Sequence, residues 1–249
     1  MVKNERQERI HEILNSRNFV TVQELSEKLF ISESSIRRDL MEMEKKRIIK
    51  RSYGGAQLIR TKTNVVDFGA RSYDFMEAKQ TIASKAAKQI PEGSVVFLDQ
   101  SSTCYFLAVE LMDYTNLTVV SNNLEILSLL SHTGLTVHAT GGVISPNNHN
   151  CLIGGSAERA FREIYADFMF FSAKAVSDTG VIMDCTQEEI FVRKAMMEHS
   201  TKKIFLCDSS KKGTMAPFIQ CNLGDVDGLI CENDAFSEIA ARYPKLQTF

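Results

Sequence analysis

Six short apolar runs, separated by helical stretches between residues 95 and 230, constrain the fold of this chain more than any other sequence feature. Strands that are apolar without alternation are buried on both faces, and strands separated by helices usually pair in parallel. We therefore predict an α/β domain whose mostly parallel sheet is covered by helices on both faces. The predicted strands are Val95–Leu98, Leu117–Val120, Thr136–Ala139, Phe168–Phe171, Ile204–Leu206 and Leu229–Ile230.

Polar residues and glycines gather where these strands end. They are Asp99-Gln100-Ser101-Ser102-Thr103 after the first strand, Ser121-Asn122-Asn123 after the second, Thr140-Gly141-Gly142 after the third, Asp208-Ser209-Ser210-Lys211-Lys212-Gly213 after the strand at Ile204, and Gly154-Gly155-Ser156 in a further loop. Such residues also form ordinary turns and helix caps, so one cluster alone indicates little. Ligands of parallel sheets bind at the carboxyl ends of strands, where a helix N-terminus favours an anion such as phosphate. The repetition predicts a pocket for a polar ligand.

The first 59 residues predict a separate module of three helices and a hairpin. Apolar residues recur at helical spacing in Glu5–Ser16, after the T-x-x-E capping box of Thr21 and Glu24, and after Ser32 or Ser34, either of which can cap the third helix. The residues expected to face a small core are Ile10, Ile13, Leu14, Val22, Leu25, Leu29, Ile36, Leu40 and Met43, with Phe19 beside them. The residues left on the outer side of the third helix are Glu33, Ser35, Arg37 and Arg38.

A basic segment with two glycines follows the third helix. Ile48-Ile49 and Gln57-Leu58-Ile59 flank Lys50-Arg51-Ser52-Tyr53-Gly54-Gly55-Ala56, which predicts a strand, a tight turn and a second strand. Such a wing would lie along the phosphate backbone of DNA and add affinity that falls with salt. Residues 1–60 hold 13 Lys and Arg against 9 Asp and Glu, whereas the rest holds 16 against 22, so the basic surplus is confined to this module.

These observations together predict a winged helix-turn-helix that binds double-stranded DNA. Arginine near the N-terminus of a recognition helix can contact guanine through two hydrogen bonds, and serine can reach bases or phosphates. Two alternatives stay open: a structural hairpin beside a helix with ordinary surface charges, and a three-helix module that binds protein. The candidate DNA contacts are Thr21, Ser32, Glu33, Ser34, Ser35, Arg37, Arg38, Lys50, Arg51, Tyr53, Gly54 and Gly55.

The chain resembles the DeoR family of bacterial transcription regulators over essentially its whole length. The matching segments of the first module are VTVQELSEKL (Val20–Leu29), SESSIRRDL (Ser32–Leu40) and RSYGGA (Arg51–Ala56). Those of the larger domain are FLDQSSTC (Phe97–Cys104), VVSNNLEI (Val119–Ile126), TGGVIS (Thr140–Ser145), CLIGGSAE (Cys151–Glu158) and LCDSSKKG (Leu206–Gly213). The resemblance implies operator binding, usually repression, and an effector domain with the fold of ribose-5-phosphate isomerase that takes a phosphorylated sugar.

The resemblance also implies roles for residues of the larger domain. Ser101, Ser102 and Thr103 would hold the phosphate, with Asn122, Gly142, Asp208 and Lys211 near the ligand. One departure is the turn after Phe168–Phe171, which reads FFSAKAV where the family commonly has a glycine-rich turn with an acid. Lys174 there could pair with an anionic effector or point to solvent. The candidate effector contacts are Asp99, Ser101, Ser102, Thr103, Asn122, Gly141, Gly142, Lys174, Asp208 and Lys211.

The domain boundaries follow from these patterns. We expect the DNA-binding domain over residues 1–59, a linker over 60–75 that is mixed and weakly periodic, and the effector domain over 76–249, which opens with a helix from about Met76 to Ile90. No signal-peptide pattern and no run of 18 apolar residues occurs, so we expect a cytoplasmic protein without a membrane partner. The six cysteines lack metal-ligand spacing, and we expect reduced core thiols, no metal and no cofactor.

Two function classes remain for the whole chain. The first is a transcription regulator, expected as a homo-oligomer because symmetric readers recognise repeated half-sites. The second is a sugar-phosphate isomerase or deaminase fused to a nucleic-acid-binding module. An isomerase needs a positioned acid and base, and no spacing marks two of the candidates as partners. These candidates are Asp99, Lys174, Asp184, Glu188, Glu189 and Asp208. We therefore expect a regulator with no catalytic residues.

Overall fold

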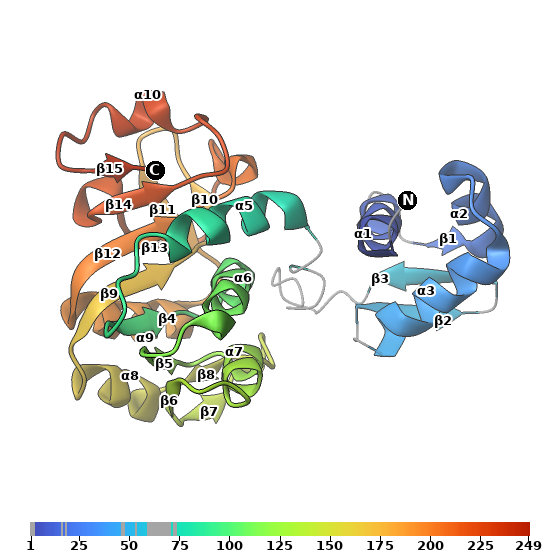
Figure 1. Cartoon of the computed structure of the whole chain (residues 1–249). Coiled ribbons are helices and arrows are strands. Elements are labelled where there is room, and N and C mark those ends of the chain that lie inside the picture. The colour runs from blue at the N-terminus through green and yellow to red at the C-terminus, as the bar shows by residue number, and fades with distance from the viewer. Residues whose placement is uncertain are drawn as a thin grey trace. The chain divides into compact units, whose positions relative to one another are not determined.

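The computed structural model describes residues 3–15, 17, 19–45, 48–52, 54–58, 71 and 74–249. The chain divides into two units, Met1–Met76 and Glu77–Phe249. Of the linker expected over residues 60–75, residues 60–70, 72 and 73 lie outside the described part. Figure 1 shows the elements of each unit.

The first unit is a small helical domain with a short sheet. Its capping box is confirmed, because the Thr21 hydroxyl accepts the N–H of Glu24 at 3.1 Å and the Glu24 carboxylate accepts the N–H of Thr21 at 2.8 Å. The strands form one antiparallel sheet in the order β1-β3-β2. The elements are α1 (Lys3–Asn15), β1 (Val20–Thr21), α2 (Val22–Leu29), α3 (Glu33–Lys45), β2 (Ile49–Ser52) and β3 (Gly55–Leu58).

The apolar residues predicted to face this small core do so. Eight of the nine are buried together, and Ile13 packs against the cluster partly buried. Phe19 differs from the expectation, since 40% of it is exposed. The helices are also joined by charge: Asp39 of α3 is 1% exposed and accepts two hydrogen bonds from Arg6 of α1. The hydrogen bond with Asp39 raises the pKa of Arg6, outweighing the opposite effect of burial.

The second unit is built on a seven-stranded parallel sheet in the order β15-β14-β12-β9-β4-β5-β6. Each of the six apolar runs lies wholly or mostly in one of its strands, which confirms the predicted fold class. The first and third runs coincide with their strands. The strands that contain the fourth and fifth runs begin earlier, at Ala166 and Ser200, where charged or polar residues interrupt the apolar pattern. The strands are β4 (Val95–Leu98), β5 (Thr118–Ser121), β6 (Thr136–Ala139), β9 (Ala166–Phe171), β12 (Ser200–Leu206), β14 (Gly228–Ile230) and β15 (Gln247–Thr248).

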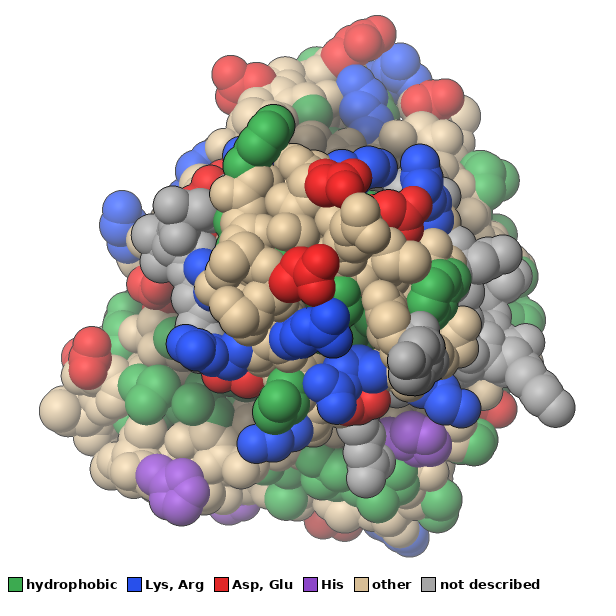
Figure 2. All heavy atoms as spheres, turned by 90° about the vertical axis from the view of Figure 1, so that its right-hand side faces the viewer, with side chains coloured by type: hydrophobic (Ala, Val, Ile, Leu, Met, Phe, Trp, Pro, Cys, Tyr) green, Lys and Arg blue, Asp and Glu red, His purple; other side chains and the backbone are tan. Residues whose placement is uncertain are grey.

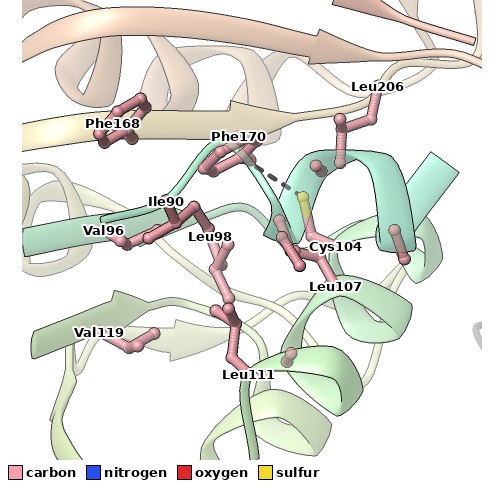
Figure 3. Close-up of a cluster of buried hydrophobic side chains, with 14 of the residues drawn as sticks. Ile90, Val96, Leu98, Cys104, Leu107, Leu111, Val119, Phe168, Phe170 and Leu206 are labelled. Atoms are coloured by element: carbon pink, nitrogen blue, oxygen red, sulfur yellow. Dashed lines mark hydrogen bonds between the residues drawn. The ribbon is translucent and has the colours of Figure 1, made fainter. Parts of the chain in front are cut away.

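Alternate residues of these strands enter two separate cores, one on each face of the sheet. Val96 and Leu98 of β4 face one core, and Phe97 between them faces the other. On the first face α5 (Met76–Ala87), α6 (Ser102–Glu110) and α7 (Leu124–Leu130) pack over the strands. Figure 3 shows part of this core, in which the Cys104 thiol donates to the carbonyl of Phe170 at 3.3 Å.

The opposite face is covered by α8 (Gly155–Arg162), α9 (Gln187–Glu198) and α10 (Ser237–Ala240). A second, antiparallel sheet in the order β10-β11-β13 and a hairpin of β7 with β8 complete the unit. The remaining elements are β7 (Val143–Ile144), β8 (Leu152–Ile153), β10 (Ala175–Val176), β11 (Val181–Asp184), β13 (Phe218–Asn222) and the 3-10 helices η1 (Leu111–Asp113), η2 (Ser209–Lys211) and η3 (Leu223–Asp225).

The six cysteines all lie in the described part of this second unit, and none of them forms a disulfide there. Cys104, Cys151, Cys207 and Cys231 are buried. Burial raises the pKa of Cys104 and Cys207 well above the ordinary thiol value, so these thiols stay protonated at neutral pH. Among the helices of the described ranges, none combines the length and apolarity that crossing a bilayer requires.

Candidate nucleic-acid interface and effector site

The N-terminal half of α3 presents an exposed polar face. Ile36 and Leu40 are buried, whereas Ser32, Glu33, Ser34, Arg37 and Arg38 are exposed and Ser35 is half-buried. The helix begins at Glu33, which places Ser32 at its N-cap position, where the Ser32 carbonyl accepts the N–H groups of Ser35 and Ile36. The short hydroxyls and two arginines therefore surround the free end of the helix, the arrangement that a recognition helix uses.

A groove of about 380 Å³ separates this helix from the wing. Arg37 and Leu40 line it from α3, and Arg51, Ser52 and Gly54 line it from the wing. Its walls therefore carry a cation on each side, together with the carboxylate of Glu44. Figure 2 shows lysine and arginine side chains gathered near the centre of the view, with acidic side chains among them.

Ion pairs hold two of these cations in place. Arg37 donates to Glu33 one turn earlier at 2.9 Å, and both side chains are about half exposed. Glu44 of α3 accepts hydrogen bonds from the backbone N–H of Arg51 at 3.0 Å and from Arg51 Nε at 2.7 Å, which ties β2 to α3. The backbone hydrogen bond from Arg51 lowers the pKa of Glu44. Arg38 and Lys50 are exposed.

The two wing glycines serve different needs. Gly54 lies in the turn at φ +81°, a conformation that side chains other than glycine seldom adopt, and its carbonyl accepts the N–H of Val22 at 2.8 Å. Gly55 is buried in β3, and a Cβ there would lie 2.3 Å from the carbonyl oxygen of Val20. Thr21 is engaged in capping α2. The remaining wing candidate, Tyr53, lies outside the described residues.

In the second unit, the first polar cluster is arranged by the end of β4 and the start of α6. Ser101 is the N-cap of α6, and its hydroxyl accepts the N–H of Cys104 at 3.1 Å. Asp99 is fully buried and accepts the N–H of Ser101 at 2.9 Å. Ser102 and Thr103 are also buried, and Thr103 Oγ1 has no hydrogen-bond partner within the residues described.

A buried arginine joins this cluster to β11 and α9. Arg193 of α9 is 1% exposed and lies 2.5 Å from Asp184, 3.3 Å from Asp99 and 3.5 Å from Glu189. Burial alone would lower the pKa of Arg193, but the three carboxylates, Asp184 foremost, raise it above its ordinary value. The side-chain amide of Gln100 donates to the Glu189 carboxylate at 2.9 Å. The cluster holds more negative than positive charge.

The second cluster lies at the end of β12. Lys211 contacts Asp208 at 3.3 Å and donates to the hydroxyl of Ser172 at 2.7 Å. Ser172 in turn donates its own N–H to Asp99 at 3.3 Å, so the two clusters are continuous. Burial would raise the pKa of Asp208, but Lys211 and the Ser210 hydroxyl outweigh it and lower that pKa.

The other candidates lie around the same edge of the sheet with different surroundings. Asn122 follows β5 and donates to the carbonyl of Leu152 at 3.0 Å, while its Oδ1 is buried without a partner in the described part. Gly141 and Gly142 are exposed at positive φ between β6 and β7. Lys174 is exposed, and the hydrogen bond found for it is made by its backbone N–H.

Sequence reasoning did not single out Arg193 as a functional residue. A signal existed, because Glu189 and Arg193 are four residues apart on the face of the helix 187–198 that also carries Ile190 and Val192. Charged residues in register with an apolar face indicate a buried pair. What the sequence could not show is that Asp99 and Asp184 reach the same point from other elements.

Comparison with known proteins matches both units. The model of the DeoR C terminal sensor domain matches residues 74–233, and that of the DeoR-like helix-turn-helix domain matches residues 6–62. The HTH-type transcriptional regulator YulB of Bacillus subtilis is 32% identical over 94% of this chain and 90% of its own length. GolR of Listeria innocua is 31% identical over 92% and 90%.

Further similarities concern a named repressor and an isomerase fold. The glycerol-3-phosphate regulon repressor of Escherichia coli is 28% identical over 91% of this chain and 88% of its own length. Ribose 5-phosphate isomerase A of Methanocaldococcus jannaschii aligns with a TM-score of 0.42 at 17% identity, covering 55% of this chain and 54% of that one. With both family models matched along most of its length, the chain belongs to the DeoR family of transcriptional regulators.

Proposed function

We propose that this protein is a repressor of a sugar-metabolism operon, which binds operator DNA through α3 and the wing. A phosphorylated sugar, held at the carboxyl ends of β4, β5 and β12, controls its affinity for DNA. It acts as a homo-oligomer, because paired copies recognise repeated half-sites, and it acts in the cytoplasm, where its operator lies. The relatives' names describe regulators and repressors, which favours regulation over catalysis.

The exposed end of α3 is the observation that carries the DNA-binding part of the proposal. Arg37 and Arg38 are exposed beside three serines, and the adjoining groove has Arg51 on its other wall. Such a groove suits a phosphate backbone passing between helix and wing, while the helix end enters the major groove. In the free protein the Glu33 carboxylate accepts a hydrogen bond from Arg37 and so limits the repulsion between Arg37 and its basic neighbours. On binding, a DNA group would replace Glu33 as the partner of Arg37.

Two unpartnered polar atoms support the effector part. Thr103 Oγ1 and Asn122 Oδ1 are buried at the ends of neighbouring strands and lack hydrogen-bond partners among the described residues. Buried polar atoms are rarely left unpaired in a functional state, so hydroxyl and phosphate groups of a ligand would satisfy them. Lys211 and the N-terminus of α6 supply positive potential at the same edge. The effector must bind the DNA-competent and DNA-free states with different affinity.

The DNA-binding proposal is tested by alanine substitution and gel-shift titration on the promoter of the protein's own gene cluster. If Arg38 contacts a base, Arg38→Ala should weaken binding by about 5- to 150-fold. If Arg38 contacts a phosphate, the substitution should make the slope of log affinity against log salt concentration shallower by about one. Arg9→Ala, on α1 and 56% exposed, is the matched control for loss of one positive charge. Equal affinity of the Arg38→Ala variant and the wild type, at several salt concentrations, would contradict this site.

The effector proposal is tested by a thermal-shift screen of phosphorylated sugars, each beside its unphosphorylated form. A ligand should raise the melting temperature of the wild type, and Thr103→Val should remove that shift because it deletes the unpartnered hydroxyl at constant size. Ser200→Ala is the control, since Ser200 carries a buried unpartnered hydroxyl at the opposite end of the sheet, where β12 begins. A shift that survives Thr103→Val but not Ser200→Ala would place the ligand elsewhere.

A further inference from the structure

A long stretch without charged residues forms one edge of the second unit. Residues 126–157, 32 in succession, contain no Asp, Glu, Lys or Arg, whereas about eight would be expected from the chain's average of 24%. The stretch includes β6, the edge strand of the seven-stranded sheet, and the β7–β8 hairpin. Many of its residues are exposed, so the lack of charge is not explained by burial inside one copy. Depletion of charge is typical of surfaces that become the core of an interface.

The edge strand β6 also has backbone groups that find no hydrogen-bond partner among the described residues. The N–H groups of Thr136 and Thr140 donate to Leu117 and Ser121, so these residues direct their backbone toward β5. Because backbone direction alternates along a strand, Val137 and Ala139 direct their N–H and C=O groups outward. Natural edge strands are commonly protected by lysine, proline or a bulge. The sequence of β6, TVHA, contains neither lysine nor proline.

Exposed apolar side chains adjoin this edge. Val143 is 67% exposed and Ile144 is 52% exposed, both on β7, which follows β6 after Thr140 and two glycines. Both residues lie in a regular antiparallel pair of strands, since β7 pairs with β8. Apolar side chains beside an unprotected strand edge mark a surface that another protein covers.

We propose that the β6 edge and the β7 strand form the interface with a second copy of this chain. The two β6 strands pair antiparallel across a two-fold axis through His138, so that Val137 of each copy exchanges two hydrogen bonds with Ala139 of the other. An uncharged surface can pair with the same surface of a second copy without repulsion between like charges. A charged partner such as DNA would have no opposite charge to bind there. The choice of a second copy as the occupant rests on the proposed function, which requires paired reading modules.

A second set of exposed apolar side chains, on α9, on β13 and in the loop before β13, fits this role less well. Met215 is 75% exposed, Ile219 of β13 is 66% exposed and Phe191 of α9 is 45% exposed. Exposed charged residues stand next to them in the sequence, including Glu188 and Lys194 of α9. Charge is depleted in the core of an interface, so these charged neighbours disfavour the second set of side chains as such a core. This second set serves as the matched comparison in the test.

The first test measures the molar mass of the full chain by sedimentation velocity without DNA, so a failure of operator binding does not affect it. The wild type should be dimeric at micromolar concentration, and the double variant Val143→Asp, Ile144→Asp should weaken the dimer at least tenfold. The double variant Met215→Asp, Ile219→Asp should stay dimeric. A monomeric wild type, or dissociation by the second pair alone, would overturn the proposal.

A cysteine cross-link tests the strand pairing itself. His138 faces its own copy at a non-hydrogen-bonded position, where Cα atoms are about 4.5 Å apart, within the range a disulfide can span. The variant His138→Cys should therefore give a covalent dimer under mild oxidation. The wild type, with its native cysteines, and Met215→Cys should remain uncrosslinked. A dimer that His138→Cys fails to cross-link would refute the edge-to-edge pairing.

Discussion

Replacing Arg193 with methionine should destabilise the second unit strongly while leaving its shape unchanged. Methionine keeps most of the apolar volume of the arginine stem but removes the cation that faces Asp99, Asp184 and Glu189. All of these groups except part of Asp184 are nine-tenths or more buried, so water cannot take over the role of the guanidinium. The variant therefore leaves three carboxylates in one buried site without a counter-charge.

The size of the effect follows from what remains around the carboxylates. Breaking a buried ion pair by removing one partner costs about 3–5 kcal/mol. Gln100 and Asn148 still donate to Glu189, and the backbone N–H of Ser101 still donates to Asp99. We therefore expect the lower part of the range, ~3–4 kcal/mol. For a domain of this size that is a fall in melting temperature of roughly 6–16 °C.

Calorimetry at pH 7 with a matched control measures the effect. Arg162→Met on α8 is the control, because Arg162 is 44% exposed and its ion pairs, at 3.4 Å, contribute about 1 kcal/mol or less. A fall in melting temperature below 2 °C for Arg193→Met, or one no larger than that of Arg162→Met, would refute the reasoning.

Three further changes test other parts of the structure. Phe30→Gly should stabilise the first unit by about 0.5–1 kcal/mol in urea titration, because Phe30 is 95% exposed at φ +55° and glycine removes the left-handed strain; a lower midpoint would show that the ring stabilises the fold. Gly55→Ala should cost ~1–3 kcal/mol and weaken operator binding, since the new Cβ meets the Val20 carbonyl at 2.3 Å and must displace the wing from β1; unchanged stability would contradict the close packing. Asp208→Asn should cost ~2–4 kcal/mol at pH 7 by leaving Lys211 without its partner. Because the pKa of Asp208 is lowered, its contribution is fully present above about pH 4 and is lost progressively as the pH falls below that value, so the melting temperatures of the two proteins should approach each other in that range. A difference that stays constant on acidification would argue against the ion pair.

Local patterns were sufficient for most of the fold. The capping box at Thr21 and Glu24 determined where α2 begins, because two backbone groups are satisfied by side chains within four residues. The continuous apolar runs located the central strands, since a strand between two helical layers must be apolar on both faces. Strand ends were less predictable. Residues Ser200–Lys203 extend β12 with two lysines among them, which a pattern of apolar residues does not include.

The sequence predicted which loops form the candidate effector site but not which residues within them contact one another. The sequence located the polar clusters around Ser101–Thr103 and Asp208–Lys211, because parallel strands bring their carboxyl ends to one edge. It could not reveal that Ser172 connects them through hydrogen bonds to Asp99 and from Lys211. Likewise, Asp39 stands in the recognition-helix motif beside two outward arginines, and only its burial against Arg6 shows that it holds the helix in place.

The sequence by itself thus determined the two modules, the recognition helix, the basic wing and the family, because each depends on interactions between residues close together in the chain. Tertiary structure decided which charged groups are buried. Arg193 meets Asp99 and Asp184 only after β4, β11 and α9 have packed, and burial there makes their pairing obligatory. It also decided that β6 is the last strand of the sheet within the described part of the chain, since strand order depends on how distant segments pair and not on the composition of any one of them.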